Sequence, residues 1–349
     1  MTAEVTEATT ALTRPLLELT GIDVILGRGW RANHVLSDVN LKVWPGEIIG
    51  LVGETGSGKT TLARTIVGLA RSRGGRVLFD GTEISRLRGA ARRRERRTGH
   101  IQLVFQDPLR SLDPDLTVGD IVGEGLKIRG GLSAAEITAR VEDALAKVGL
   151  SATLRHRVPG QLSGGQRQRV SIARALATDP KLLLCDEPVS ALDASNRNYI
   201  LRLLAGLRDS LGLPIVIISH DLSSLAGIAD RVVVLYRGRI VEDGPVAQVF
   251  TRPRHPYTAL LMASAPSVKH DRELSVHQLR RTTADPEPPS AAGACVFAAR
   301  CPFAIDPCAL QPPLEPVADQ AADRWSAACH RHEEWPDLAA ARPVAAVRR

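Results

Sequence analysis

The stretch GETGSGKT, residues 53–60, constrains the fold of this chain more than any other feature. It matches the phosphate-binding pattern G-x-x-x-x-G-K-[ST], follows the apolar run EIIGLVG (47–53) and precedes the helix-like KTTLARTIVGL (59–69). Glycines let the backbone curl so that its N–H groups face a phosphate, and the helix N-terminus adds partial positive charge. Lys59 can reach the β- and γ-phosphates of a nucleotide, and Thr60 can ligate Mg²⁺. The sequence therefore predicts a nucleoside triphosphate site between a strand and a helix.

Short apolar runs recur along the chain, with helix-like stretches between several of them. The runs lie at 47–53, 76–81, 100–106, 181–188, 214–221 and 231–236. The stretch 133–149 begins with Ser133 and Glu136 at the spacing of a capping box and ends at Gly149, a helix-stop residue. This alternation predicts an α/β fold with a largely parallel, buried sheet. From about residue 251 the chain is rich in proline, which indicates a loop-rich tail that does not continue the sheet.

Two adjacent carboxylates close the apolar run KLLLCDEP (181–188). Asp186 would lie beside the phosphate loop and hold Mg²⁺ through water, and Glu187 can polarise a water for attack on the γ-phosphate. Two adjacent acids alone would indicate only a solvated strand end. Their place after a buried run and downstream of a phosphate loop favours the magnesium site. Cys185 in the same run is expected to be a core residue.

A second helix start that can face a phosphate is predicted at QLSGGQRQRV (161–170), where a Ser-Gly-Gly turn precedes an apparent helix. One nucleotide cannot need both sites from a single subunit, unless a second subunit supplies one of them. The segment ISHD (218–221) places His220 directly after another apolar run. A lone histidine in such a place is more often structural.

Taken together, these segments resemble the ATP-binding cassette (ABC) ATPases. The matching features occur in order as the phosphate loop, Gln106 in VFQDP, LSGGQ (162–166), LLLCDEP (182–188), SALD (190–193) and His220. The resemblance implies an α/β fold of the P-loop NTPase class and ABC type at residues 16–250, with a RecA-like core and an antiparallel β subdomain. It also implies a helical subdomain at about 109–165. We further expect a disordered N-terminus at 1–15 and a loop-rich, cysteine-containing extension at 251–349.

The resemblance implies a head-to-tail dimer that encloses two ATP molecules. Glu187 would be the catalytic base, His220 would contact the γ-phosphate, and Gln106 would sense Mg²⁺ and water. The Mg²⁺ ligands implied are Thr60, Gln106 and Asp186. Asp193 would communicate across the dimer, and the LSGGQ residues would serve the partner's ATP. The nucleotide-binding residues implied are Gly53, Glu54, Thr55, Gly56, Ser57, Gly58, Lys59, Thr60, Thr61, Ser163, Gly164, Gly165, Gln166 and Asp193.

One position departs from the family pattern. The family usually stacks adenine on an aromatic side chain in the first strands, and the matching position here is Leu26. Because Trp30 is close in sequence, our hypothesis is that Trp30 binds adenine in its place. The alternative is that adenine is held by apolar contact alone.

Three segments, 105–122, 220–244 and RPRHPYTALLMASAP (252–266), are similar to the oligopeptide, dipeptide and nickel importer ATPases. The similarity implies an ATPase that energises peptide import, with nickel, opines and glycosides as alternative substrates. Implied partners are two transmembrane permease subunits, a second related ABC ATPase in a heterodimer (or a second copy in a homodimer) and, indirectly, an extracytoplasmic substrate-binding protein. The chain would lie peripherally on the cytoplasmic face of the cell membrane. The alternatives of another class are a non-transport ABC ATPase and a redox-sensing regulatory module.

Four of the five cysteines, Cys295, Cys301, Cys308 and Cys329, gather in the tail. The chain shows no secretory signal and no apolar run long enough to span a bilayer, so we expect a cytoplasmic protein with reduced thiols. Disulfides are then a poor explanation, and metal binding is the leading one. The spacing C-x₅-C-x₆-C-x₂₀-C matches neither the usual zinc nor the ferredoxin pattern, and four thiolates suit zinc or an iron–sulfur cluster.

The tail pattern C-x-F-x-x-R-C-P, followed by a cysteine and by C-H, is typical of the peptide-importer ATPases. In that family it implies a [4Fe–4S] cluster with a structural role, while zinc or free thiols are the alternatives. Net charge is +7 and is carried mostly by arginine. The run LRGAARRRERRTGH (87–100) is expected to be a solvated face or to face lipid headgroups or the permease. We expect no nucleic-acid partner.

Overall fold

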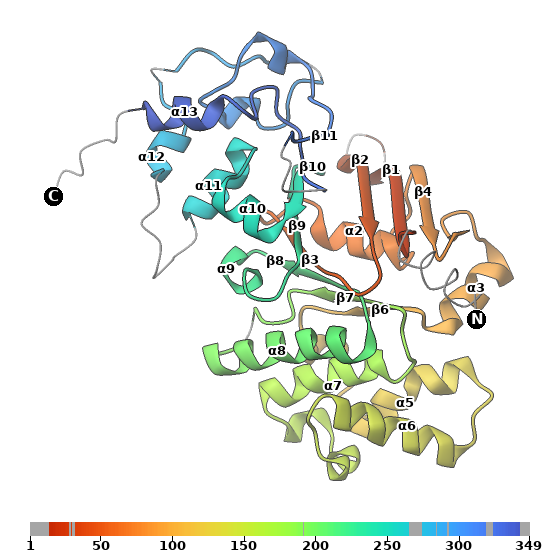
Figure 1. Ribbon diagram of the computed structural model, residues 1–349. Helices are drawn as coiled ribbons and strands as arrows, with labels where there is room; N and C mark the ends of the chain where they lie inside the picture. The colour runs from red at the N-terminus through yellow and green to blue at the C-terminus, as the bar shows by residue number, and fades with distance from the viewer. Residues whose placement is uncertain are drawn as a thin grey trace, which may run out of the picture.

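A computed structural model of the protein describes residues 14–27, 29, 32–190, 192–264, 274–283, 285–291, 293–318 and 324–342. Residues 1–13 of the expected disordered N-terminus lie outside this description. Two sheets carry the fold, and helices pack around them (Figure 1). The α/β class predicted from the sequence is confirmed.

A four-stranded antiparallel sheet, in the order β2-β1-β4-β5, packs against the helix that follows the phosphate loop. Its strands alternate buried and partly exposed positions, as expected of a sheet with one face on the core. Leu62 and Ile66 of α2 (Lys59–Ile66) belong to the same apolar cluster as the buried face of this sheet. The strands are β1 (Leu17–Leu26), β2 (Asn33–Val43), β4 (Gly74–Phe79) and β5 (Thr82–Glu83).

An eight-stranded sheet, in the order β11-β12-β10-β9-β3-β8-β7-β6, forms the centre of the molecule. Strands β3, β7 and β8 are buried along their whole length, which explains their unbroken apolar runs. β3, β6, β7, β8 and β9 run parallel, so the carboxyl ends of β3, β7 and β8 meet at one edge of the sheet. The parallel strands are β3 (Ile48–Val52), β6 (Ile101–Val104), β7 (Leu182–Asp186), β8 (Ile215–Ser219) and β9 (Arg231–Tyr236).

The tail departs from one expectation, because it does continue the sheet. β12 (Ser326–Ala327) pairs antiparallel with β10 (Arg239–Pro245), and β11 (Glu315–Pro316) pairs with β12. The prediction that the tail stays apart from the sheet was therefore wrong. Two strands of two residues each are too short to show a strand periodicity in the sequence.

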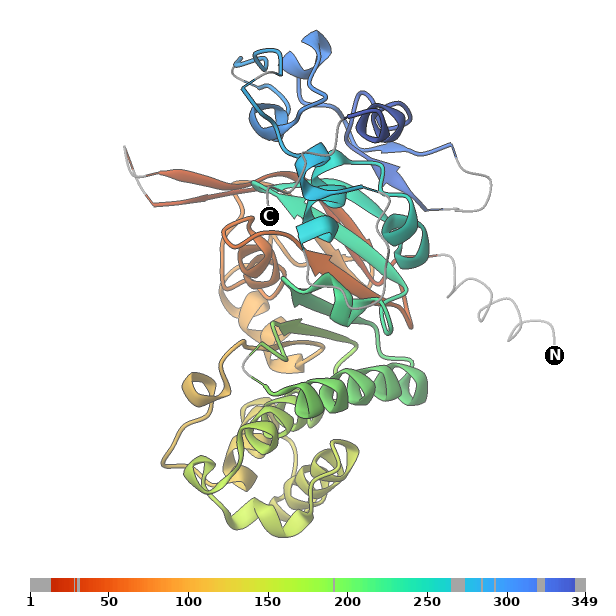
Figure 2. The ribbon, with the colours of Figure 1, turned by 90° about the vertical axis from the view of Figure 1, so that its left-hand side faces the viewer.

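Helices gather at the end of the molecule opposite the tail (Figures 1 and 2). The predicted capping box is confirmed in α6, where the Ser133 hydroxyl accepts from the Glu136 N–H and the Glu136 carboxylate accepts from the Ser133 N–H. None of the helices in the described residues is long and apolar enough to cross a membrane. The helices of this half are α3 (Gly89–Thr98), α4 (Pro108–Ser111), α5 (Val118–Arg129), α6 (Ala134–Lys147), α7 (Gly164–Leu176) and α8 (Ala194–Leu211), with 3₁₀ turns η2 (Ala152–His156) and η3 (Pro159–Gln161).

The C-terminal extension shares its apolar core with the central sheet. The buried carboxylate of Glu242, on β10, accepts hydrogen bonds from the backbone N–H groups of Arg254 (2.8 Å) and His255 (3.0 Å) and from the indole of Trp325 (3.0 Å). This one side chain therefore ties together three separate segments. The remaining elements are α9 (Leu222–Leu225), α10 (Val246–Thr251), α11 (Pro256–Ser264), α12 (Val276–Leu279), η4 (Ala298–Arg300), η5 (Asp306–Ala309) and α13 (Trp335–Ala340).

Candidate nucleotide-binding site

The phosphate loop joins the end of β3 to the start of α2, as the sequence predicts. Gly53 has a φ of 153°, and a Cβ there would lie 2.1 Å from the carbonyl oxygen of Leu235. Gly58, with a φ of 110°, would place a Cβ 2.7 Å from a methyl group of Leu36. Both positions therefore require glycine. The loop is fixed by β9 on one side and by the antiparallel sheet on the other.

The ammonium group of Lys59 lies folded over this loop. Its Nζ donates to the carbonyl oxygens of Gly53 (2.7 Å) and Glu54 (3.0 Å), and the residue is buried. Burial lowers the pKa of Lys59, and the nearby carboxylates of Glu187 and Asp186 oppose that shift. In the described part of the chain this buried cation is bonded only to carbonyl oxygens, so it can turn toward a phosphate.

Thr60 and Asp186 meet at the carboxyl ends of β3 and β7. The Thr60 hydroxyl donates to Asp186 Oδ1 at 3.2 Å. Burial raises the pKa of Asp186, while the hydrogen bond from Thr60 lowers it. A hydroxyl and a carboxylate beside a phosphate loop are the oxygen donors that Mg²⁺ takes in nucleotide sites, so these residues fit the ion.

Side chains from two other segments contact Glu187. Gln106 Nε2 donates to Glu187 Oε2 at 2.8 Å, and His220 Nδ1 lies 3.3 Å from Glu187 Oε1. Glu187 itself has a φ of 47°, an unusual backbone conformation for a residue other than glycine. The Glu187 side chain is 19% exposed and that of His220 is 58% exposed, so the group is open to water. The structure thus brings together three predicted site residues that are far apart in the sequence.

The residues of LSGGQ lie at the start of α7. Ser163 is the N-cap of this helix and forms a capping box with Gln166. Gly165 is packed so closely that a Cβ would lie 2.5 Å from Asn196 Oδ1. Among the described residues, no hydrogen bond or ion pair joins residues 163–166 to the phosphate loop.

Asn196 was missed by the sequence analysis and joins the two predicted interface motifs. It lies on α8, and its Nδ2 donates to Asp193 Oδ2 at 2.7 Å while its N–H donates to Asp193 Oδ1 at 2.9 Å. Asp193 is the N-cap of α8. The spacing D-x-x-N was the only local signal, and it does not reveal the contact with Gly165.

The adenine hypothesis lies outside the described residues, because Trp30 is not among them. Leu26, at the end of β1, is described and is 45% exposed. An exposed leucine leaves room for apolar contact with a base, but the proposed role of Trp30 stays a prediction.

All five cysteines are free thiols, and Cys185 is buried in β7 as expected. The four tail cysteines lie near enough to influence one another: beyond the effect of burial, Cys295 and Cys308 also raise the pKa of Cys329, which reaches about 12. Burial likewise raises the pKa of Cys295 and Cys301. Among the described residues, no group of three or more His, Cys, Asp or Glu side chains is placed to hold a single metal ion. The expected zinc or cluster site therefore has no support from the placement of these side chains.

Backbone N–H groups point at three of these sulfur atoms. Cys295 accepts from Phe297 and Ala298, Cys301 from Phe303, and Cys329 from Arg331. Such bonds stabilise thiolates and are part of the environment of iron–sulfur clusters. The donor set suits a cluster chemically.

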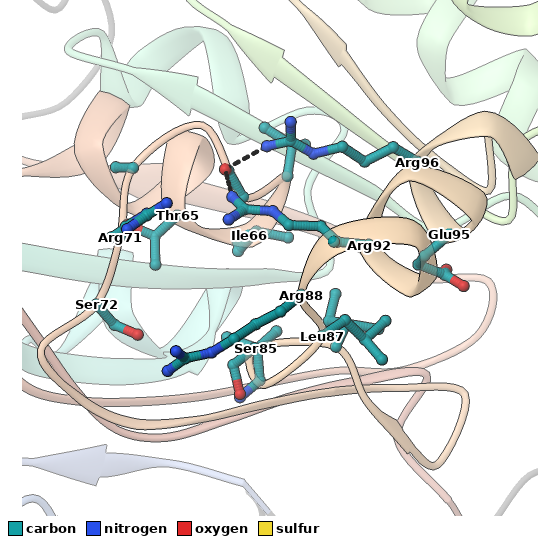
Figure 3. A pocket seen from close by; sticks show the side chains of 16 residues that line it. Thr65, Ile66, Arg71, Ser72, Ser85, Leu87, Arg88, Arg92, Glu95 and Arg96 are labelled. Atoms are coloured by element: carbon teal, nitrogen blue, oxygen red, sulfur yellow. Dashed lines mark hydrogen bonds between the residues drawn. The ribbon is translucent and has the colours of Figure 1, made fainter.

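The arginine run forms α3, of which no residue is buried. Arg92 and Arg96 both donate to the carbonyl oxygen of Gly68, beyond the C-terminus of α2 (Figure 3). With Arg71 and Arg88 they line a pocket of about 330 Å³. Burial lowers the pKa of Arg92, and the neighbouring Arg96 and Arg71 lower it further. This pocket lies at the far end of α2 from the phosphate loop.

Comparison with known proteins gives consistent matches. Residues 36–190 match the family model of ABC transporters, and residues 241–308 match that of the oligopeptide/dipeptide transporter C-terminal region. The chain is 42% identical over 300 residues to a putative peptide import ATP-binding protein of Brucella ovis, covering 86% of this chain and 93% of the relative. It is 43% identical over 282 residues to the oligopeptide transport ATP-binding protein OppF of Haemophilus influenzae, covering 80% and 83%.

Two solved structures are similar to this fold. One is a dimeric ATP-binding cassette in a post-hydrolysis state bound to ADP and Pi, with a TM-score of 0.60 and 31% identity, covering 66% of this chain and 98% of that one. The other is a component of the CbiONQ ABC transporter complex of Clostridium perfringens, with a TM-score of 0.61 and 30% identity, covering 70% and 93%.

Proposed function

The chain belongs to the ABC transporter ATPases, and we propose that it hydrolyses ATP to drive the import of peptides through a separate transmembrane permease. The peptide class follows the relatives, which are named as peptide import or oligopeptide transport ATP-binding proteins. Nickel or an opine is the alternative cargo.

The observation that carries the proposal is the convergence of Gln106 and His220 on Glu187, next to the Thr60–Asp186 pair. Glu187 would accept a proton from the attacking water, and His220 would approach the γ-phosphate. Thr60, Asp186 and Gln106 would hold Mg²⁺, which, when bound, neutralises charge on the phosphate oxygens. A general base of this kind contributes about 10²- to 10⁴-fold to the rate.

The phosphate loop would bind the nucleotide, and a second subunit would complete the site. The proposed loop contacts are the backbone N–H groups of residues 53–61 and the Lys59 ammonium. Ser163, Gly164, Gly165 and Gln166 would face the partner's ATP, and Asp193 would transmit the state of one site to the other. In support, these residues form their own cluster at the starts of α7 and α8, unbonded to the chain's own phosphate loop in the described part.

The proposed assembly includes two permease subunits and a second related ATPase, with a homodimer as the alternative. The chain would lie on the cytoplasmic face of the membrane, and a substrate-binding protein on the other side would deliver the cargo. ATP would bind the closed dimer better than the open one, so binding would shift the population toward closure and hydrolysis would reverse it.

We also propose that Cys295, Cys301, Cys308 and Cys329 hold a [4Fe–4S] cluster, with zinc as the alternative. The backbone N–H donors and the mutual influence of the thiols support this assignment. A cluster holds its thiolates farther apart than a single ion does, so the lack of a single-ion site in the described part of the chain weighs more against zinc. When bound, the cluster would hold the loop-rich extension together, because ATP hydrolysis needs no redox step.

Metal analysis tests the cluster proposal. Protein purified without oxygen is expected to contain about four irons and four acid-labile sulfides per chain. Cys308→Ser should lower both and make the extension more sensitive to protease. Zinc alone, or no metal, would contradict the cluster.

Hydrolysis and transport test the function. Together with its permease, the second ATPase and the substrate-binding protein, the purified chain should hydrolyse ATP and import labelled peptide into vesicles, and Glu187→Gln should reduce hydrolysis about 10²-fold or more while retaining ATP binding. A matched control is Glu334→Gln, because Glu334 is an exposed tail carboxylate paired with Arg331. Unchanged hydrolysis in Glu187→Gln would exclude the proposed base.

A further inference from the structure

The C-terminal extension reaches the phosphate loop directly. Arg300, the last residue of η4, forms a bidentate ion pair with Glu54, from its Nη1 to Oε2 (2.9 Å) and from its Nη2 to Oε1 (3.0 Å). The Tyr257 hydroxyl accepts a hydrogen bond from the Glu54 N–H at 2.9 Å. The second residue of the loop is thus held through both its side chain and its backbone.

An aromatic layer keeps these two groups in place. The rings of Tyr236 and Tyr257 have centroids 4.3 Å apart, and Phe297 packs against both at 5.4 and 5.6 Å. The Arg300 guanidinium lies over the rings of Tyr236 and Phe297, and its Nη1 contacts the Tyr236 hydroxyl at 3.3 Å. Tyr257 and Phe297 are fully buried. The Arg300 and Glu54 side chains are 42% and 44% exposed, so the ion pair lies at the surface, on top of this packed aromatic layer.

We infer that Arg300 and Tyr257 are positioning residues that hold the phosphate loop in its nucleotide-binding conformation. The inference rests on the proposed function. Two physical effects support it. Glu54 places a negative charge beside the site for an anionic ligand, and Arg300 compensates that charge. The Glu54 carbonyl oxygen also accepts from Lys59 Nζ at 3.0 Å, so fixing the Glu54 backbone fixes a partner of the lysine that meets the phosphates.

The same contact links the thiol segment to the nucleotide. Arg300 directly precedes Cys301, and Phe297 donates its N–H to Cys295. Because coupling between two sites is reciprocal, nucleotide in the loop should in turn steady residues 295–301. Nucleotide affinity would then depend, through this ion pair, on whether the extension is folded.

A double-mutant cycle tests the ion pair. We expect Arg300→Met to weaken the binding of a non-hydrolysable ATP analogue about three- to fivefold, with KM raised and kcat little changed. Glu54→Gln in the Arg300→Met background should cause no further loss and should restore part of the affinity, because it removes the carboxylate that has lost its compensating cation. Arg300→Lys should restore part of the affinity. Tyr257→Phe should weaken binding by a similar factor, because it leaves the Glu54 N–H without its acceptor.

The matched control is Arg342→Met, which breaks a bidentate pair with Asp285 that lies wholly within the extension. This variant should leave nucleotide affinity unchanged even if the extension loses stability. Equal affinity in wild type and Arg300→Met, or equal losses in Arg300→Met and Arg342→Met, would overturn the inference. Failure of the wild type to bind the analogue would instead contradict the proposed function.

Hydrogen exchange provides a second readout that is independent of activity. Adding the ATP analogue at saturation should slow exchange in residues 295–301 of the wild type and of Arg342→Met. It should leave exchange in this segment unchanged in Arg300→Met. Protection that is the same in all three proteins would contradict the coupling.

Discussion

At the scale of single residues, two ionisable residues are buried where the extension joins the core. Glu242 and His255 are both fully buried, and the backbone N–H of His255 donates to the Glu242 carboxylate. Burial raises the pKa of Glu242 from 4.5 to about 7 and lowers that of His255 from 6.5 to about 3. Folded Glu242 therefore binds a proton that the unfolded chain releases, while folded His255 releases a proton that the unfolded chain binds. Their effects on stability oppose each other between about pH 4.5 and 6.5.

We predict that Glu242→Gln leaves the effect of His255 on the pH dependence of stability unopposed. The raised carboxyl pKa favours the folded state at low pH, and this contribution is lost as pH rises toward 7. Without it, the free energy of unfolding should rise more steeply between pH 4.5 and 6.5, by up to about 1.4 kcal/mol per pH unit. His255→Asn should change the slope by a similar amount in the opposite direction. Urea unfolding at several pH values measures both, and slopes that shift in the same direction would contradict the assignment.

Lys59 allows a direct prediction on binding. Lys59→Ala removes the buried ammonium that lies over the phosphate loop, so ATP affinity should fall by about 2 kcal/mol, or about thirtyfold in Kd. Lys181→Ala is the matched control, because Lys181 is half-exposed and pairs with Asp80 away from the site. Calorimetric titration with ATP checks both. Similar affinities in the two variants would argue against the role of Lys59.

At the scale of elements, local patterns predicted the structure well where the signal lies within one segment. The capping box at Ser133, the phosphate loop before α2 and the apolar runs of β3, β7 and β8 are all of this kind. The strands β11 and β12 are too short to give a pattern. Arg300 and Glu54 are 246 residues apart, so their contact depends on how the extension packs and not on any local spacing.

The cap of α6 gives a prediction at this scale. Ser133→Ala removes the hydroxyl that accepts from the Glu136 N–H, so the free energy of unfolding should fall by about 1 kcal/mol. Ser210→Ala is the control, because the Ser210 hydroxyl bonds a carbonyl oxygen within α8 and caps no helix start; we expect a change below about 0.5 kcal/mol. Urea unfolding compares the two. Equal losses in free energy of unfolding would show that the cap stabilises the fold no more than the Ser210 hydrogen bond does. ATP hydrolysis should be unchanged in both variants.

At the scale of the whole molecule, the extension and the helical region lie at opposite ends, with the central sheet between them (Figure 2). The extension contacts the phosphate loop, while residues 163–166 and Asp193 lie at the starts of α7 and α8. Within one chain these two groups make no hydrogen bond or ion pair among the described residues. The proposed head-to-tail dimer would use both, because the start of α7 in one chain would lie over the phosphate loop of the other.

Gly164 gives the sharpest test of that arrangement. A Cβ at Gly164 would meet no atom within 4 Å in the single chain, so Gly164→Val should fold and bind ATP normally but obstruct a partner's nucleotide. In the Glu187→Gln background, ATP and Mg²⁺ should produce a dimer, with a second copy or with the related ATPase, and Gly164→Val should abolish it. Gly206→Val is the matched control, because Gly206 on α8 has equally open space. Light scattering after size exclusion measures the mass; a dimer that persists in Gly164→Val would place the interface elsewhere.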